Sequence, residues 1–256
     1  MPPRDEPIRS DSRVIDWLIS QRCGVMPALD VDSFDDMLAL VAQTCEIPGV
    51  VGYKLGLTGV LPRGLAAAVK GIREHTSLPI IYDHQKAGPD MPDMATKFSA
   101  LSRAAGVDGL VLFPVAGPTA VRSFTASALE NSLLPLVGGH IPVPDYCQSG
   151  DGFLRDDVLD RIIEIAAQTG ARGFILPSNL PEQISRHCDW IAKQVANPLV
   201  FLTGIGALGG SIATAFSAAR QVGPRFAIVG RAISLASDRQ TAARRIIDEI
   251  HKACGI

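Results

Sequence analysis

Leu78-Pro79-Ile80-Ile81 runs directly into Tyr82-Asp83-His84-Gln85-Lys86-Ala87-Gly88-Pro89-Asp90. The apolar beginning of this stretch, which has no polar alternation, predicts a buried strand. Two acids, Asp83 and Asp90, then bracket Lys86 where the strand is expected to end. A lysine between carboxylates keeps its proton, and a fixed ammonium stabilises a developing carbanion before it donates that proton. The alternative for this cluster is a salt-bridged loop on the rim of a fold.

The same unit, an apolar run followed by a helical stretch, recurs along the whole chain. Short apolar runs are typical of parallel strands that are buried on both faces. The predicted strands are residues 24–30, 50–55, 78–83, 108–113, 133–138, 173–176, 199–202 and 226–229, and the predicted helices that follow them are 33–45, 62–75, 93–105, 118–131, 155–169, 181–195, 211–222 and 238–253.

Eight strand–helix units in a chain of 256 residues predict an α/β protein of the closed (β/α)₈ TIM barrel type. We expect residues 11–256 to form this single domain, with a short helix at 11–21 across its bottom and a flexible arm at 1–10. An open doubly wound sheet is the alternative fold. That fold needs a glycine-rich turn after the first strand, where this chain has Asp30-Val31-Asp32-Ser33. The Gly- and Pro-rich stretch 138–152 is predicted to be a mobile lid.

Composition narrows the class of protein further. Hydrophobic residues make up 47% and charged residues 20% of the chain, as in a globular enzyme, and the net charge is −2. We therefore expect neither a nucleic-acid surface nor a membrane partner, and we expect no signal peptide. The five scattered cysteines form no CxxC pair, which predicts neither a zinc site nor a disulfide framework and favours the cytoplasm.

Polar residues gather at the predicted strand ends. Chemistry in a barrel of this type lies at the C-terminal ends of the strands. There the first three strands carry Asp30, Lys54, and the Asp83–Lys86–Asp90 cluster. Considered alone, Asp30 could instead cap the next helix, and Lys54 could instead form a salt bridge on the rim. Taken together, two acid–lysine pairs on three successive strands indicate an active site.

The last two strands indicate an anion site. The seventh is followed by a glycine-rich loop that contains Gly204, Gly206 and Gly209, and the eighth by Gly230-Arg231. Backbone N–H groups at glycines bind phosphate, and an arginine adds a bidentate contact. Because the glycines follow the seventh strand and not the first, they favour one phosphate monoester over a dinucleotide.

These residues resemble the orotidine 5′-phosphate decarboxylase family of phosphate-binding barrels, from about Val25 to Ala253. The matching segments are residues 28–30, 53–56, the acid–lysine–acid cluster, 177–182, 204–210 and 229–233.

The resemblance implies a role for each matching residue. Lys86 corresponds to the proton donor to C6 of the pyrimidine, Asp83 to the acid beside the substrate carboxylate, and Lys54 to the lysine that orders the charges. Asp90 corresponds to an acid that a second subunit inserts, which implies a homodimer. The candidate substrate contacts are Asp30, Asn179, Pro181, Gly204, Gly206, Gly209, Gly230 and Arg231. No metal and no cofactor is implied.

The chain departs from the family pattern around Lys86, which places it in a divergent branch. The family usually has one residue between the first acid and the lysine and two before the second acid. Here His84-Gln85 and Ala87-Gly88-Pro89 fill these gaps, and Leu208 stands where the phosphate loop often has a glutamine.

The resemblance implies cofactor-free decarboxylation of orotidine 5′-monophosphate, a nucleotide monophosphate, in pyrimidine synthesis. Two alternatives share the scaffold. One is a Mg²⁺-dependent sugar-phosphate enzyme, either a 3-keto-L-gulonate 6-phosphate decarboxylase or a hexulose-phosphate synthase. The other is a non-catalytic barrel that binds a phosphorylated metabolite.

Overall fold

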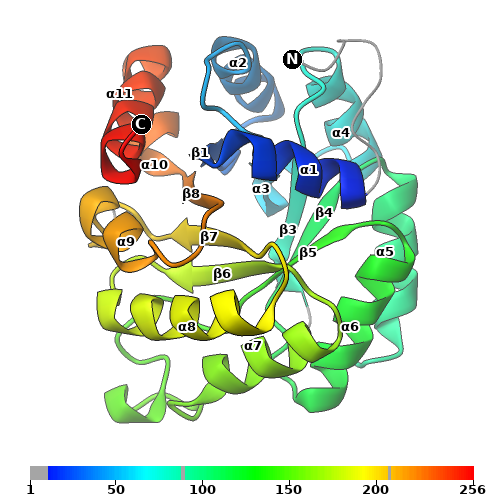
Figure 1. Cartoon of the computed structure of the whole chain (residues 1–256). Coiled ribbons are helices and arrows are strands. Elements are labelled where there is room, and N and C mark those ends of the chain that lie inside the picture. Colours follow the sequence, from blue (N-terminus) through cyan, green and yellow to red (C-terminus); the bar gives the residue numbers. More distant parts are fainter. Residues whose placement is uncertain (1–10, 88–89, 207–208) are drawn as a thin grey trace.

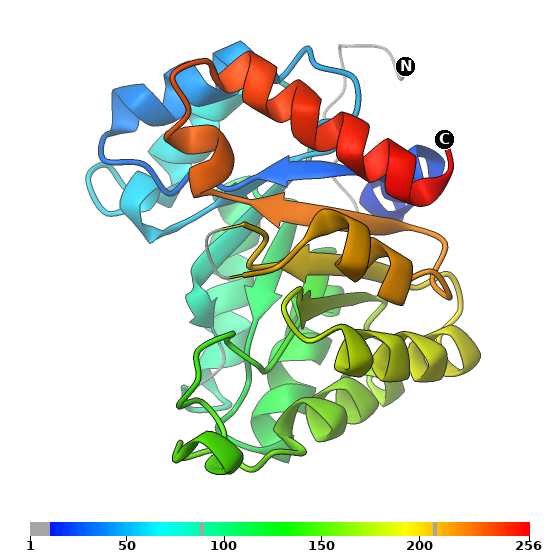
Figure 2. The same cartoon turned by 90° about the vertical axis from the view of Figure 1, so that its left-hand side faces the viewer.

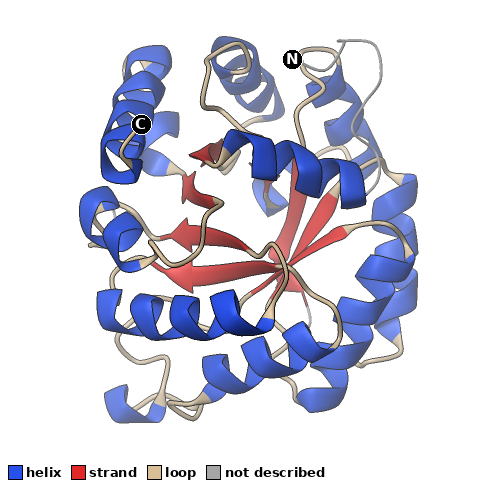
Figure 3. Ribbon diagram, in the orientation of Figure 1, coloured by secondary structure: helices blue, strands red, loops and turns tan. Residues whose placement is uncertain are grey.

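The structure is a computed structural model that describes residues 11–87, 90–206 and 209–256, with the backbone alone at Asp11 and residues 85–87. The predicted arm at residues 1–10 lies outside the described residues. Parallel strands form the centre of the molecule and helices surround them (Figures 1 and 3). The strands are β1 (Cys23–Pro27), β2 (Tyr53–Leu55), β3 (Ile80–Ala87), β4 (Gly109–Leu112), β5 (Leu134–Val137), β6 (Gly173–Pro177), β7 (Leu199–Thr203) and β8 (Arg225–Val229).

The helices follow the strands in the predicted alternation. They are α1 (Asp11–Gln21), α2 (Phe34–Thr44), α3 (Leu57–Val60), α4 (Leu65–Arg73), α5 (Met94–Ala104), α6 (Pro118–Glu130), α7 (Val158–Gln168), α8 (Pro181–Gln194), α9 (Ile212–Ala218), α10 (Arg231–Ser234) and α11 (Arg239–Cys254), with a 3₁₀ turn at Gln148–Gly150. Within the described ranges, none of these helices combines the length and the apolar character needed to cross a bilayer.

The sheet closes on itself. Its strands are hydrogen-bonded in the order β1-β8-β7-β6-β5-β4-β3-β2, so β1 and β2 are the two edges. These edges meet through isolated parallel bridges, Val25–Val50 and Ala28–Lys54, and the Leu29 N–H donates to the Lys54 carbonyl at 2.8 Å. The predicted barrel is confirmed, and the doubly wound alternative is wrong.

The strands separate two apolar cores, as alternating side chains require. One core fills the barrel and includes Met26, Phe201 and Phe226, and α1 closes one end of it with Val14 and Leu18. Figure 1 shows α1 lying across that end of the barrel, where the sequence predicts it. The larger core lies between the strands and the surrounding helices. In Figure 2, α11 lies along β1 and β8, so the last helix covers the first strand.

Helix starts follow the capping signals in the sequence. The Ser33 hydroxyl accepts from the Asp36 N–H at 3.1 Å, and the Asp238 carboxylate accepts from the Thr241 N–H at 3.0 Å. The predicted helix at 62–75 is present as the shorter α4, Leu65–Arg73, and the short helix α3, Leu57–Val60, which precedes it, was not predicted. Gly64, with a φ of 82°, separates them in a conformation that a helix cannot contain. The short helix α10 was not predicted.

Strand β3 is longer than predicted and irregular. It extends through Ala87, so Lys86 belongs to the strand and not to a loop beyond it. Tyr82 lies opposite Leu110 of β4, but the next matched pair is Ala87 with Leu112. Five steps along β3 therefore accompany two steps along β4, which defines a bulge over residues 83–86.

The stretch after β5 is the longest connection among the described residues. It is ordered by its own contacts: the Gly152 N–H donates to the Cys147 carbonyl at 2.9 Å, and the Gln148 N–H to the Leu154 carbonyl at 2.7 Å. A Cβ atom at Gly150 would lie 1.9 Å from the Pro144 carbonyl oxygen, so only glycine fits there. The motion of this stretch as a lid stays a prediction.

Candidate active site

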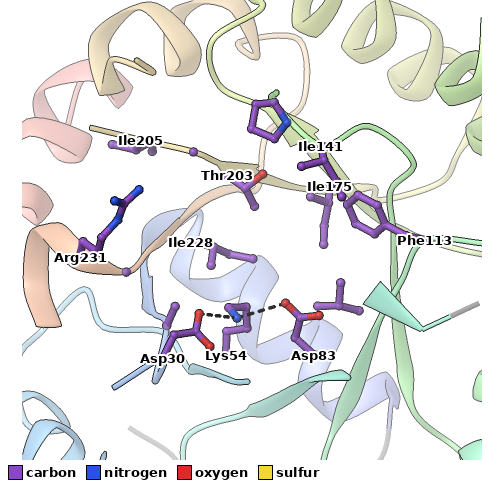
Figure 4. A pocket seen from close by; sticks show the side chains of 15 residues that line it. Asp30, Lys54, Asp83, Phe113, Ile141, Ile175, Thr203, Ile205, Ile228 and Arg231 are labelled. Carbon is purple, nitrogen blue, oxygen red and sulfur yellow. Dashed lines mark hydrogen bonds and ion pairs between the residues drawn. The ribbon is translucent and has the colours of Figure 1, made fainter. Parts of the chain in front are cut away.

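A cavity of about 470 Å³ opens among the C-terminal ends of the strands. This size suits a small-molecule ligand, and the location is that of the active site in barrels of this type. Figure 4 shows Asp30, Lys54 and Asp83 at its base and Ile205 and Arg231 on one side. The lining includes six sequence-predicted residues, Asp30, Lys54, Asp83, Gly204, Gly230 and Arg231.

The base of the cavity is a row of three charged side chains. Lys54 Nζ lies 2.9 Å from Asp30 Oδ2 and 3.1 Å from Asp83 Oδ2 (Figure 4). The Asp83 side chain is only 2% exposed and that of Lys54 10%, whereas that of Asp30 is 38% exposed. The row therefore runs from the buried Asp83 to an acid that a ligand in the cavity can reach.

The Lys54 ammonium is held charged by its neighbours. Burial alone lowers the pKa of Lys54, because an apolar surrounding disfavours the charged form. The negative charges of Asp83 and Asp30, and their hydrogen bonds, outweigh burial and raise the pKa above its ordinary value. Lys54 is thus a fixed cation between two carboxylates at neutral pH.

The strand register explains how distant residues meet in this row. Lys54 lies opposite Ala28 of the β1 edge on one side and opposite Ile81 of β3 on the other. The acids follow these partners by two residues each, which brings Asp30 and Asp83 to the same level on either side of Lys54. Gly56 completes the arrangement, because a Cβ atom there would lie 1.8 Å from Asp30 Oδ1. Gly56 was not predicted as a site residue.

The opposite side of the cavity carries the glycine-rich loop and Arg231. Gly204, Gly206 and Gly209 have φ angles of 84°, 75° and 84°, a left-handed backbone that favours glycine. The loop is closed by its own hydrogen bonds, among them the Gly206 N–H to the Gly210 carbonyl at 2.8 Å. Only Gly204 of the three lines the cavity; Gly206 and Gly209 are exposed, and Ala207 and Leu208 lie outside the described residues.

Arg231 opens α10 directly after β8 and lines the cavity from there. Its side chain is exposed, and the guanidinium has no hydrogen bond or ion pair with the described part of the chain. Figure 4 shows it on the same side of the cavity as Ile205 of the loop. A free guanidinium beside a glycine-rich turn is suited to bind a phosphate group.

The remaining wall is apolar and was not predicted. It is formed by Val111, Phe113, Ile141, Pro142, Ile175 and Ile228. Most of them lie near strand ends and face the barrel interior. The sequence alone does not show which residues of a strand face inward, so they could not be identified from it. A flat heterocycle fits against such a wall, since it gains apolar contact there while its polar edge faces the charged row.

Besides Gly206 and Gly209, three predicted residues do not line this cavity, and one cannot be placed. Asn179 is exposed in the turn after β6, and Pro181 begins α8 beside a separate hollow. Asp90 is exposed and lines another hollow with residues 91–92 and 116–120. The Lys86 backbone is in β3, but its side chain lies outside what the structure describes.

The described part of the chain holds no group of three or more His, Cys, Asp or Glu side chains arranged for a metal ion. His140 follows β5 but does not line the cavity; its ring stacks on Tyr146 with 5.2 Å between ring centroids. His84 lies on the outer side of β3 against Tyr82. All five cysteines are free thiols.

Comparison with known proteins identifies the family. Residues 24–246 match the model of the Orotidine 5′-phosphate decarboxylase / HUMPS family. A curated orotidine 5′-phosphate decarboxylase of Methanosarcina barkeri is 30% identical over 225 residues, 87% of this chain and 92% of the relative. That of Thermococcus kodakarensis is 26% identical over 223 residues, 87% of this chain and 95% of the relative.

Solved structures agree on the fold. A crystal structure of orotidine 5′-monophosphate decarboxylase from Methanocaldococcus jannaschii, complexed with the inhibitor BMP, superimposes with a TM-score of 0.73 at 23% identity, over 89% of this chain and 98% of that one. The enzyme from Pyrococcus horikoshii gives a TM-score of 0.67 at 24% identity, over 89% and 99%.

The fold and the charged cavity define a barrel enzyme of the class that acts on phosphorylated metabolites. Within that class, the chain belongs to the Orotidine 5′-phosphate decarboxylase / HUMPS family. Its identity to the curated relatives, 26% and 30%, agrees with a divergent branch.

Proposed function

We propose that this protein is an orotidine 5′-monophosphate decarboxylase, which converts its substrate to uridine 5′-monophosphate and CO₂ without a metal or an organic cofactor. The observation that carries the proposal is the Asp30–Lys54–Asp83 row at the base of a cavity with one apolar wall. The curated relatives from Methanosarcina barkeri and Thermococcus kodakarensis, which match 87% of the chain, carry the name of this enzyme. Pyrimidine synthesis in the cytoplasm is the role that follows, and the five free thiols are in keeping with a reducing compartment.

The cavity has a place for each part of the substrate. The phosphate group binds Arg231 and the loop that begins at Gly204, and Gly230 lines the cavity beside Arg231. The ribose hydroxyls lie near Asp30, which is the most exposed member of the charged row. The pyrimidine lies against Phe113 and the rest of the apolar wall, with its C6 carboxylate toward Asp83. Gly206, Gly209, Asn179 and Pro181 then act around the cavity and not in its lining.

The chemical step uses charges that are already in position. The bond between C6 and the carboxylate carbon breaks, CO₂ leaves, and the electron pair stays on C6. The Lys86 ammonium stabilises this carbanion and then donates a proton to C6, and it regains a proton from solvent. Fixed charges need no reorganisation during the reaction, which makes them more effective than water. The negative charge of Asp83 keeps the Lys86 ammonium charged, and Lys54 holds the Asp83 carboxylate in place from 3.1 Å.

We infer that the working form is a homodimer in which Asp90 enters the cavity of the partner subunit. Asp90 is exposed and does not line the cavity of its own chain. Next to it, Met91 is 66% exposed, and Leu101 of α5 is 71% exposed. Exposed large apolar side chains favour burial against a second copy.

A Mg²⁺-dependent sugar-phosphate enzyme is the second candidate, because the family description names both branches. The test is the ultraviolet absorbance of orotidine 5′-monophosphate with purified protein, once with EDTA and once with Mg²⁺. Loss of the orotate chromophore in EDTA supports the proposal. No change in either tube, together with turnover of a sugar phosphate only with Mg²⁺, would replace it with the second candidate. Nucleotide binding without any turnover would indicate a non-catalytic barrel.

A further inference from the structure

The bulge in β3 interrupts, once, the alternation of side chains between the two faces of the sheet. Tyr82 lies opposite Leu110, and Ala87 lies opposite Leu112. Both leucines belong to the core between the strands and the helices, as does Tyr82. Neighbours in register share one face of a sheet, and alternate residues of a strand face opposite sides. Ala87 follows Tyr82 by five residues, whereas Leu112 follows Leu110 by two. Regular alternation over five residues would put Ala87 on the opposite face of the sheet from Tyr82. The alternation of β3 must therefore break once between residues 82 and 87.

This break decides which backbone positions face the barrel interior. Asp83, one step after Tyr82, lies at an inner position and lines the cavity. Residue 86, one step before Ala87, is at an inner position as well, by the register of Ala87 with Leu112. Without the bulge, two intervening residues would put positions 83 and 86 on opposite faces. The bulge thus compensates for the longer gap between the acid and the lysine.

His84 holds the bulge from the outer side of the strand. Its Nδ1 and the Tyr82 hydroxyl are hydrogen-bonded to each other. Its ring centroid lies 5.5 Å from that of Tyr82 and 5.8 Å from that of Phe98 on α5. Phe98 in turn lies 6.3 Å from Phe124 of α6, so the contact reaches into the helical layer. Burial and the charge of Asp83 raise the pKa of Tyr82 to about 12, so its hydroxyl stays protonated at neutral pH.

We propose that His84 is a positioning residue that fixes the β3 bulge in the register that brings Lys86 to the cavity. This inference rests on the proposed function, in which Lys86 is the proton donor. A shift of one residue in a strand moves each side chain to the other face, so a bulge without an anchor is free to exchange Lys86 for a neighbour. The ring contacts with Tyr82 and Phe98 supply the anchor, and the hydrogen bond to Tyr82 fixes the direction of the imidazole.

The test compares His84→Ala with His84→Asn, which keeps a polar atom near the position of Nδ1, and with Tyr82→Phe, which removes the same hydrogen bond from the other side. His75→Ala, at an exposed histidine after α4, is the matched control. The first readout is amide hydrogen exchange of the peptide over residues 80–90, which needs no turnover. The second is kcat and KM for orotidine 5′-monophosphate, with the Kd of uridine 5′-monophosphate.

We expect His84→Ala to speed exchange in the 80–90 peptide and not in β2 or β5, while His75→Ala changes neither. We expect kcat to fall about 100-fold, as for a misplacement of about 1 Å, with KM and the product Kd within a few-fold of the parent. The kcat of His84→Asn should lie between those of His84→Ala and the parent. The kcat of Tyr82→Phe should also fall, but by less than that of His84→Ala.

The two readouts separate the two hypotheses. Unchanged exchange over 80–90 in His84→Ala would overturn the anchoring role whatever the enzyme does. Faster exchange with an unchanged kcat would overturn the link between the bulge and Lys86. A parent protein that does not decarboxylate the substrate would refute the proposed function, and the exchange data would still decide whether His84 holds the bulge. If His84→Ala does not fold, His84→Asn and Tyr82→Phe give the same comparison.

Discussion

The carboxylate of Asp30 occupies the space where a side chain at residue 56 would stand. A Cβ atom on Gly56 would lie 1.8 Å from Asp30 Oδ1 and 3.4 Å from Lys54 Nζ. The absence of a side chain after β2 is therefore a condition for the ion pair between β1 and β2.

We expect Gly56→Ala to displace Asp30 and to weaken its 2.9 Å contact with Lys54. Loss of a charge-assisted hydrogen bond costs about 1.5–3 kcal/mol, so KM for the substrate should rise about 10- to 100-fold. Steady-state kinetics checks this prediction. Gly223→Ala is the matched control, because a Cβ atom there meets no atom within 4 Å. An unchanged KM in Gly56→Ala would show that Asp30 moves aside without loss.

Lys54→Met removes the ammonium that lies 3.1 Å from the carboxylate of Asp83, a side chain that is 2% exposed. Removing one partner of a buried ion pair typically costs about 3–5 kcal/mol, and we expect a loss of this size in the free energy of unfolding. Urea denaturation of the variant and of Lys193→Met, at an exposed lysine of α8, measures the difference. Equal stability of the two variants would mean that water or a shifted side chain satisfies Asp83.

The Lys54 contribution to stability has a defined dependence on pH. Its pKa is raised in the folded protein, so folding favours the protonated form. The contribution is fully present below the pKa of an unfolded lysine, about 10.4, and is lost as pH rises through the higher folded value. The stability difference between the parent and Lys54→Met should thus stay constant across neutral pH and shrink only in alkaline solution. A difference that shrinks near pH 7 would contradict this assignment.

Arg231→Ala should raise KM without changing stability, because the guanidinium is exposed and makes no ion pair within the described ranges. We expect an increase of about 10- to 100-fold for the phosphorylated substrate, from the loss of charge-assisted hydrogen bonds. Orotidine, which lacks the phosphate, should react equally with the parent and the variant. Arg220→Ala, at an exposed arginine beside a different hollow, serves as the control. A KM that stays at the parent value removes Arg231 from the phosphate site.

Lys86→Ala should abolish turnover while the binding of uridine 5′-monophosphate largely survives, since the phosphate and ribose contacts come from other strands. Calorimetry gives the Kd, and the loss of orotate absorbance gives the rate. Near-normal rates in this variant would assign the proton to another group.

Cys254 is expected to be the most reactive thiol at the closed end of the barrel. A hydrogen bond from Cys23, helped by the charges of Arg225 and Arg22 against the effect of burial, lowers the pKa of Cys254 to about 7. The rate of alkylation by iodoacetamide, followed by peptide mass spectrometry, should have its midpoint near that pH. In Cys23→Ala the midpoint should move toward the ordinary thiol value of about 8.5. The same midpoint in both proteins would exclude the hydrogen bond as the cause.

The architecture was predictable because eight short apolar runs specify parallel strands, and the caps at Ser33 and Asp238 mark where helices begin. Elements that depend on tertiary contacts were not predictable from the sequence. The start of α4 after Gly64 depends on the left-handed backbone of that residue, so the helical pattern that begins at residue 62 predicts a start that is too early. The extension of β3 through Lys86 depends on pairing with β4 across a bulge, and polar residues alone predict a loop there.

The charged row was predictable because Asp30, Lys54 and Asp83 all lie at the ends of neighbouring strands, and such ends meet. The apolar wall was not, since Phe113 and Ile175 differ from other core residues only in the direction they face. Asn179 and Pro181 follow a strand as closely as the row residues do, yet the turn after β6 carries them away from the cavity. A position close to a strand end in the sequence is therefore not sufficient to bring a residue into the cavity.

The seam between β1 and β2 is joined only by isolated bridges, and one of them is formed by Lys54 itself. The Asp30–Lys54 ion pair crosses the same seam at 2.9 Å. The contact that closes the barrel between its two edge strands is thus also the base of the cavity. Separation of these two strands would also disrupt the ligand site. Enzyme activity therefore reports whether the barrel is closed between β1 and β2.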